Sequence, residues 1–281
     1  MAVGSVGTDG PGPVSHVRCE LVFDVEDHVS LALHVAVADT AGVRLSERLS
    51  ISLDGAPVTD VVEHPTDHGG RIHVVECGAG RLRIAYEASS RSFPPPDKPV
   101  DPVEAITSLR QSRYCPSDAL EAFAAAELAS LPDGEQRARA IGDWVHGRLA
   151  YIPGSSGPLD TAVDTLLAGQ GVCRDFAHLT VTLCRAVGIP ARLVSVYAPA
   201  LSPMDFHAVA EVAAGDRWEI VDATRLAPRR TLVRIGTGRD AADTAFATTL
   251  SGMATLVSSM IGAVVDGDLP FDDPDLAVRI P

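Results

Sequence analysis

Apolar and polar residues alternate along much of residues 16–92. The alternation recurs in four segments, at 17–25, 29–37, 49–53 and 82–86. A period of two residues is typical of a strand with one buried face and one solvated face. Short stretches of turn-forming residues separate the segments, at 39–42, 54–57, 67–70 and 78–80. The pattern therefore predicts a small antiparallel β-sandwich over residues 14–93.

Prolines follow the predicted sandwich in quick succession, at Pro94, Pro95, Pro96, Pro99 and Pro102. A run of prolines cannot enter a helix interior or a central strand, and it makes a stiff connector. We therefore predict a linker over residues 94–104 and place the domain boundary there. The Gly-rich residues 1–13, before the sandwich, are predicted to be a disordered N-terminus.

The second half of the chain has a different periodicity. After Cys173, apolar residues recur at three- and four-residue steps, at Phe176, Leu179, Leu183 and Val187, which is typical of an amphipathic helix. Helices are predicted over 117–131, 133–149, 161–168 and 173–187, and strands follow at 191–197, 207–212, 218–221 and 232–235. Helices followed by strands favour an α+β fold over a doubly wound sheet. We expect this domain to cover residues 105–265 and an acidic tail, 266–281, to lie in solvent.

Three residues of this half suit helix starts. Ser117 is the expected N-cap of the first helix, and Thr161 with Asp164 is expected to cap the third. Gly169 is suited to end that third helix in a left-handed conformation.

Charge and hydropathy narrow the range of partners. The chain has 23 basic and 37 acidic residues, a net charge of −14. This balance argues against broad contact with nucleic acid or anionic lipid. The N-terminus lacks the basic and apolar regions of a signal peptide, and the most apolar stretch, 253–265, is too short to span a bilayer. We expect a cytoplasmic protein without nucleic-acid or membrane partners; the sequence leaves the oligomeric state open.

The chain has five cysteines, Cys19, Cys77, Cys115, Cys173 and Cys184. Their number is odd, their spacing is wide and none forms a CxxC pair, so neither a disulfide framework nor a structural zinc site is expected. We expect no metal and no cofactor. Each thiol is then either a small core residue or a reactive group.

Cys173 stands at the predicted start of a helix, directly after the stretch Gly169-Gln170-Gly171-Val172. The two glycines permit a sharp turn. Free backbone N–H groups and the positive end of the helix dipole favour a thiolate there, and the same N–H groups can bind an oxyanion. The alternative is that Cys173 is only a small buried side chain.

A nucleophilic cysteine needs a base. His207 begins one predicted strand and Asp222 follows the next. If the two strands form a hairpin around 213–216, both residues lie at the end far from the turn. There the carboxylate can accept a hydrogen bond from the imidazole and fix its tautomer. The alternatives are an ordinary half-buried histidine and a strand-ending cap.

The stretch GVCRDFAH at 171–178 resembles the nucleophile motif of the bacterial transglutaminase-like superfamily. The GIPAR stretch at 188–192, the VDAT stretch at 221–224 and the IGTGRDAAD stretch at 235–243 also resemble segments of that family. The resemblance covers about residues 105–250. Two departures are Val209, where many relatives have Trp, and Ala241, where an aromatic residue is common.

The resemblance implies a papain-like α+β core after a β domain, with Cys173 as nucleophile, His207 as base and Asp222 as orienting acid. Gln170 or Tyr114 could supply an oxyanion donor beside the backbone N–H of Cys173. The implied reaction is acyl transfer on an amide or carboxamide of a peptide or protein. A thioester would be resolved by an amine, as in a transglutaminase, or by water, as in a deamidase or peptidase. The alternative is a non-catalytic peptide-binding or scaffold module on the same fold.

Overall fold

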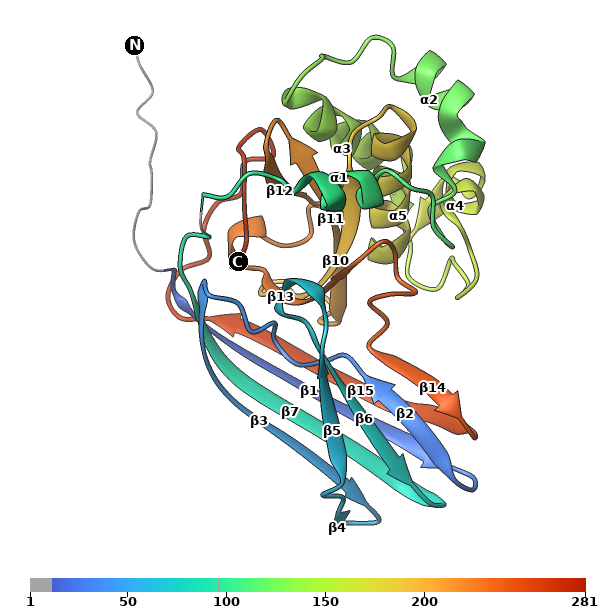
Figure 1. The fold of residues 1–281 in the computed structure, drawn as a ribbon, viewed down its shortest axis with the longest axis vertical. Helices are drawn as coiled ribbons and strands as arrows, with labels where there is room; N and C mark the ends of the chain where they lie inside the picture. The colour runs from blue at the N-terminus through green and yellow to red at the C-terminus, as the bar shows by residue number, and fades with distance from the viewer. Residues whose placement is uncertain (1–11, 96) are drawn as a thin grey trace.

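Two antiparallel sheets form the sandwich that the alternating pattern predicts (Figure 1). The computed structural model describes residues 12–95 and 97–281, so the predicted disordered segment lies, up to residue 11, outside the described residues. The first sheet has the order β15 (Ala254–Val265), β1 (Val14–Val25), β7 (Gly80–Ser92), β3 (Val43–Leu53) and β4 (Ala56–Pro57). The second has the order β14 (Ala247–Ser251), β2 (Val29–Leu33), β6 (Arg71–Cys77) and β5 (Val61–Pro65), and a short 3-10 turn, Asp67–Gly69, joins β5 to β6.

The alternation along β1 explains how the sandwich buries its core. Its inward residues are at most 4% exposed and their neighbours are more exposed; they are Val17, Cys19, Leu21 and Phe23. β1 runs antiparallel to β7 without a register shift, with Val17 opposite Ala88 and Val25 opposite Gly80. Each strand therefore contributes one apolar face to a shared interior.

Two strands of the sandwich come from the far end of the chain. We predicted a second domain that extends to residue 265, but β15 pairs with β1 and β14 pairs with β2. Ile261 and Ala263 of β15 are buried in the sandwich core. The predicted boundary is therefore wrong over 247–265, because the apolar residues of this segment do not reveal which sheet it joins.

The second half is built on another antiparallel sheet, whose order is β12 (Arg217–Val221), β11 (Phe206–Ala214), β10 (Ala191–Tyr197) and β13 (Val233–Gly238). Its helices are α1 (Pro102–Ser108), α2 (Glu121–Glu127), α3 (Gln136–Arg148), α4 (Ala162–Ala168) and α5 (Cys173–Ala186). Two short segments, β8 (Ala150–Tyr151) and β9 (Gln170–Gly171), pair in parallel. Short 3-10 turns span Ser117–Leu120 and Arg229–Thr231. The mixed helix and sheet content is the α+β fold that the sequence predicts.

The helix starts follow the predictions only in part. Thr161 and Asp164 form a reciprocal capping box at α4, and Gly169 ends that helix with a φ of +66°. Ser117 is not an N-cap, because it is buried in the 3-10 turn that precedes α2. Asp101 caps α1, so the last residues of the predicted linker are helical. The proline at position 102 fits there because the first helical N–H has no partner in any case.

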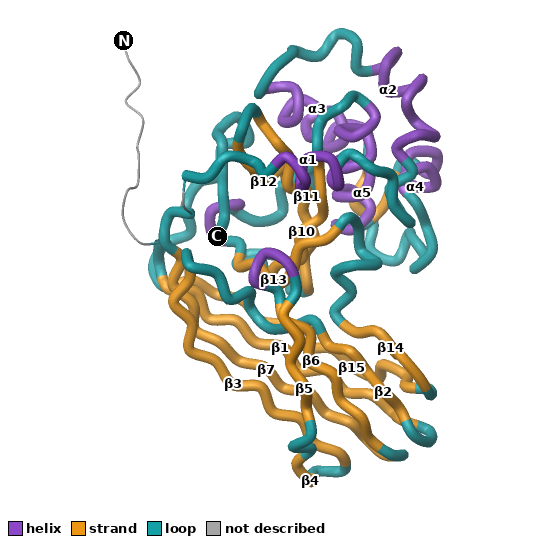
Figure 2. The backbone as a smooth tube through the Cα atoms, viewed as in Figure 1, coloured by secondary structure: helices purple, strands orange, loops and turns teal. Residues whose placement is uncertain are grey.

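Helix α5 is the central element of this half (Figure 2). Its side chains from 175 to 185 are all buried, and it shares a hydrophobic core with α3, β11 and β12 through Leu179, Ile141, Val212 and Val221. A helix that is buried on almost all sides is held firmly by its neighbours. The first residue of α5 is therefore held in position by this core.

The two halves share one hydrophobic cluster. Tyr197 of β10 and the β13 residues Val233 and Ile235 pack with the sandwich residues. The hydroxyl of Tyr197 is fully buried and donates a hydrogen bond to the carbonyl oxygen of Val35 at 2.7 Å. The end of the sheet that carries Tyr197 therefore lies against the sandwich.

The acidic tail packs on the protein, which corrects the expectation that it lies in solvent. Val278 and Ile280 are buried, and the N–H of Ile220 in β12 donates to the carbonyl oxygen of Val278 at 2.8 Å. Arg229 forms an ion pair with Asp272 at 2.9 Å. The two apolar residues near the end of the tail supply the burial that an acidic segment otherwise lacks. Across the described residues, no helix has the length and apolar character needed to cross a membrane.

Candidate active site

Cys173 is the first residue of α5, as predicted, and its side chain is partly exposed. Val172 precedes the helix in an extended conformation, and its N–H donates to the Asp175 carboxylate at 2.8 Å. A Cβ atom at Gly171 would lie only 2.6 Å from the Cβ of Asp175, so this position needs glycine. Glycine and aspartate together allow the chain to turn sharply into the helix and present the thiol at its amino end.

A buried carboxylate fixes this turn. Asp175 is fully buried, and Arg174 donates to its Oδ1 from Nε at 3.1 Å and from Nη2 at 2.9 Å. Ser156 donates to Oδ2, and Arg174 also donates to the carbonyl oxygen of Gly157 at 2.7 Å. The loop at 156–157 is thereby tied to the start of α5. Asp175 and Arg174 thus hold the start of α5 in place.

His207 and Asp222 meet at the end of the hairpin, as predicted. β11 and β12 pair with Ala210 opposite Val221, so His207 and Asp222 extend from the same end of the pair. Nε2 of His207 lies 2.8 Å from Oδ2 of Asp222. The other carboxylate oxygen accepts from the N–H and the hydroxyl of Thr224, at 2.9 and 2.7 Å. Both partners are buried, so the imidazole is held in one orientation.

The second ring nitrogen of His207 is directed to Cys173. Nδ1 is buried and has no close hydrogen-bond partner within the described residues, and the imidazole interacts with the thiol of Cys173. Burial alone would lower the pKa of His207, but the Asp222 carboxylate and the Cys173 thiol outweigh it and raise the pKa to about 10. Burial likewise opposes ionisation of Asp222, yet His207 and Thr224 lower its pKa. A thiol, an imidazole and a carboxylate are therefore aligned in series.

Cys173 differs from the other cysteines in exposure. Its Sγ lies 3.9 Å from the carbonyl oxygen of Phe206, the residue before His207. The other four cysteines are buried. Burial raises the pKa of Cys19 to about 11 and the pKa values of Cys115 and Cys184 to about 12, and it also raises the pKa of Cys77. The accessible thiol is thus the one at the helix start.

The two expected oxyanion donors both lie near α5. Gln170 lies in β9, three residues before Cys173. The ring of Tyr114 stacks on His178 at 5.3 Å, and its backbone N–H donates to Asp240 at 2.8 Å. Neither side chain makes a hydrogen bond to the three aligned residues within the described part of the chain. Their assignment as oxyanion donors stays a prediction.

Tyr151 is a site residue that sequence reasoning missed. It lies opposite Gly171 in the parallel β8–β9 pair, and its ring is 5.9 Å from that of Phe176 in the first turn of α5. Its hydroxyl interacts with the backbone N–H of Cys173. Only a two-residue parallel pairing connects these positions, and such a short segment leaves no periodic pattern in the sequence.

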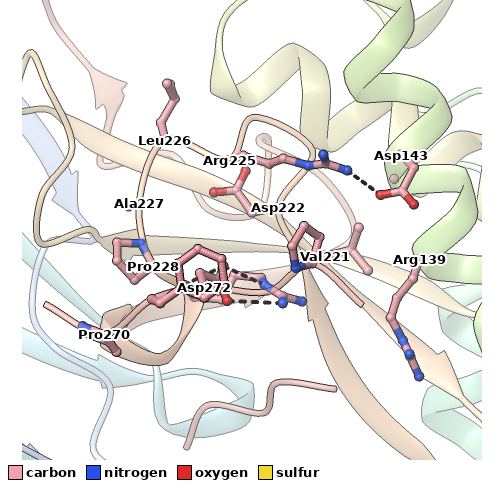
Figure 3. Close-up of a pocket in the computed structure, with 14 residues that line it drawn as sticks. Arg139, Asp143, Val221, Asp222, Arg225, Leu226, Ala227, Pro228, Pro270 and Asp272 are labelled. Atoms are coloured by element: carbon pink, nitrogen blue, oxygen red, sulfur yellow. Dashed lines mark hydrogen bonds and ion pairs between the residues drawn. The ribbon is translucent and has the colours of Figure 1, made fainter. Parts of the chain in front are cut away.

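A pocket of about 290 Å³ adjoins Asp222 on the side of α3 and the C-terminal tail (Figure 3). Two ion pairs border it: Arg225 with Asp143, and Arg229 with Asp272. Cys173 does not line this pocket. The pocket therefore lies behind the carboxylate, away from the thiol.

Known proteins are similar to this chain in fold or in sequence. Residues 122–223 match the model of the transglutaminase-like superfamily. A candidate cysteine protease from Cytophaga hutchinsonii, known from its crystal structure, is 29% identical; the match covers 97% of this chain and 99% of that one, with a TM-score of 0.85. The uncharacterized protein ML0607 of Mycobacterium leprae is 30% identical over 148 residues, which cover 49% of this chain and 52% of that protein. The chain thus spans about half the length of that curated relative.

The fold and the matched proteins define a class of thiol-dependent enzymes with an α+β core. Within this chain, residues 122–223 form a transglutaminase-like core. This agrees with the resemblance of the GVCRDFAH stretch at 171–178.

Proposed function

We propose that the protein catalyses acyl transfer on amide bonds of a peptide or protein substrate, through a thioester on Cys173. The observation that carries the proposal is the alignment of Cys173, His207 and Asp222, in which the His207 imidazole interacts with the accessible thiol and with the Asp222 carboxylate. The candidate cysteine protease from Cytophaga hutchinsonii matches nearly the full chain, which supports a peptide as the substrate.

The reaction follows from these groups. The thiolate of Cys173 attacks the amide carbonyl carbon, and the carbonyl π electrons move to oxygen. The tetrahedral intermediate collapses as the C–N bond breaks, and His207 gives its proton from Nδ1 to the leaving amine or ammonia. Water or a second amine then attacks the thioester carbonyl carbon and gives a proton to His207, the C–S bond breaks, and the Cys173 thiolate is released with the acyl product. Asp222 holds the imidazole and balances its charge in both steps.

Selective alkylation tests whether Cys173 is a nucleophile. At pH 6, iodoacetamide should modify Cys173 at least about a hundredfold faster than the four buried cysteines, because their raised pKa values leave almost no thiolate. Peptide mapping after short exposure gives the rate for each cysteine. His207→Ala should slow modification of Cys173 and leave the other rates unchanged. Slow, uniform labelling would instead favour the non-catalytic binding module.

Product analysis separates hydrolysis from transfer. A glutamine-containing peptide such as benzyloxycarbonyl-glutaminyl-glycine is incubated with and without hydroxylamine, and both released ammonia and hydroxamate are measured. Ammonia without hydroxamate indicates a deamidase, and hydroxamate at the expense of free acid indicates a transferase. Cleavage of a casein-derived peptide would indicate a peptidase. Cys173→Ala provides the blank, since it keeps the fold but has no nucleophile.

A further inference from the structure

The short β8–β9 pair brings Tyr151 to the helix start that carries Cys173. Tyr151 lies opposite Gly171, and the N–H of the next residue, Ile152, donates to the carbonyl oxygen of Gly171 at 3.0 Å. The ring packs on Phe176 with a centroid separation of 5.9 Å. These contacts fix the backbone and the ring on two sides of the turn that leads into α5.

The hydroxyl of Tyr151 faces the reacting groups. It interacts with the backbone N–H of Cys173, and the Cys173 thiol, Asp205 and Asp222 contribute to its electrostatic surroundings. Burial and these negative groups raise the pKa of Tyr151 to about 12, so the phenol keeps its proton at neutral pH. The side chain is still 36% exposed, so a substrate can reach it. A protonated, accessible hydroxyl at this position can donate a hydrogen bond.

We propose that Tyr151 is a catalytic residue whose hydroxyl, together with the backbone N–H of Cys173, binds the oxyanion of the tetrahedral intermediate. This inference rests on the proposed acyl transfer. In the free protein the phenolic oxygen occupies the place next to the Cys173 N–H. When a substrate carbonyl oxygen takes that place, the N–H donates to it instead, and the phenol O–H becomes the second donor.

A C–S bond forms between Cys173 and the carbonyl carbon as the C=O π pair moves onto oxygen, which accepts hydrogen bonds from both donors. As the C=O bond re-forms, the C–N bond breaks and the amine leaves with the proton from His207. Tyr151 keeps its own proton throughout. Gln170 and Tyr114 are then not needed for the second donor.

Two small reagents that both react at Cys173 test this assignment without knowledge of the natural substrate. p-Nitrophenyl acetate acylates the thiol through a tetrahedral oxyanion, whereas iodoacetamide alkylates it by direct displacement at carbon and forms no oxyanion. The pre-steady-state release of p-nitrophenolate and the alkylation rate are measured for the wild-type protein, Tyr151→Phe and Tyr114→Phe, with Cys173→Ala as the blank. Tyr151→Phe keeps the ring that packs on Phe176.

For Tyr151→Phe we expect acylation to slow by roughly a hundredfold, the usual effect of removing one oxyanion donor, while alkylation stays within twofold of wild type. Equal acylation rates in Tyr151→Phe and wild type would overturn the assignment. So would a parallel fall of acylation and alkylation, because Tyr151 would then act on the thiol or the fold. A larger acylation loss in Tyr114→Phe would assign the donor to Tyr114. If the wild-type protein itself shows no acylation that depends on Cys173, the proposed function fails rather than the role of Tyr151 alone.

Discussion

Two histidines, one on α5 and one near its first residue, are both buried, yet their pKa values move in opposite directions. His178 lies on α5 and accepts a hydrogen bond at Nε2 from the N–H of Ala241 at 3.1 Å. Burial lowers its pKa to about 4, against the opposing effect of Asp240. His207 has a carboxylate at 2.8 Å, and this partner outweighs the same cost of burial. Position beside a carboxylate, and not proximity to Cys173 in the sequence, decides which histidine is charged.

The low pKa of His178 leads to a prediction about the stability of the fold at acid pH. Its folded pKa lies below the value of about 6.5 in the unfolded chain, so between pH 6.5 and 4 the unfolded state binds a proton that the folded state does not. The free energy of unfolding therefore falls as pH falls through this window, by about 3 kcal/mol from this residue. Urea unfolding at pH 7 and pH 4 measures the change.

His178→Gln is the matched control, because its amide oxygen can still accept from Ala241 and does not titrate. The difference in unfolding free energy between the wild-type protein and this variant should shift by that amount, in favour of the variant, from pH 7 to pH 4. A difference that is the same at both pH values would contradict a buried neutral His178. Other buried histidines, such as His34, titrate in both proteins and cancel in the comparison.

At the scale of elements, one carboxylate joins three strands of the β12–β11–β10–β13 sheet. Glu211 in β11 is buried and pairs with Arg192 in β10 at 2.7 Å and with Arg234 in β13 at 2.6 Å. Burial opposes its ionisation, but the two guanidinium groups lower its pKa to about 2. Arg192 also lies over the ring of Trp218 in β12, at 3.9 Å from its centroid. The sheet that positions His207 is therefore held by a charge cluster as well as by the backbone hydrogen bonds between its strands.

Removing the negative charge of Glu211 should lower the free energy of unfolding. Glu211→Gln takes the buried counter-ion from Arg234 and leaves Arg192 with only the part-exposed Glu104 at 3.3 Å, and we expect a loss of about 3 kcal/mol in the free energy of unfolding. The midpoint of urea unfolding measures it. Glu20→Gln is the matched control, because Glu20 pairs with Arg83 on the solvent face of the sandwich at 2.6 Å. Its midpoint should shift far less, since surface ion pairs contribute little. Similar shifts in both variants would refute the special role of the buried cluster.

The sequence predicted helix ends and hairpins best, because the residues that form them lie close together in the chain. The Thr161–Asp164 capping box and the end of α4 at Gly169 were predicted because all their bonds lie within nine residues. The meeting of His207 and Asp222 was predicted from a hairpin count, since adjacent antiparallel strands convert sequence spacing directly into position. The expected N-cap at Ser117 was wrong, because the residue is buried at a 3-10 turn.

At the scale of the whole molecule, contacts between distant segments could not be predicted. The 253–265 stretch has the apolar character of an inner strand, but nothing in it identifies β1, more than 200 residues earlier, as its partner. The same holds for Tyr151, which reaches Cys173 only through a pair of two-residue strands. Pairings of high sequence separation depend on the assembled core, and a single sequence does not encode them in any local pattern.

The position of β15 in the sandwich leads to a prediction about cooperativity. Ile261 is 8% exposed in the shared core, while its neighbour Met260 is 57% exposed on the opposite face of the same strand. Ile261→Ala should lower the free energy of unfolding by about 3 kcal/mol, and Met260→Ala should change it by less than about 0.5 kcal/mol. Both tryptophans, Trp144 in α3 and Trp218 in β12, lie in the second half of the chain, so their fluorescence reports unfolding there.

The second half shares a hydrophobic cluster with the sandwich through Tyr197, Val233 and Ile235. Ile261→Ala should therefore shift the tryptophan fluorescence transition as far as it shifts the circular dichroism transition. Met260→Ala should move neither. A tryptophan transition that stays in place while the circular dichroism changes would mean that the halves unfold separately. Coincident transitions would mean that the sandwich, closed by a strand from the far end of the chain, supports the sheet on which His207 and Asp222 meet.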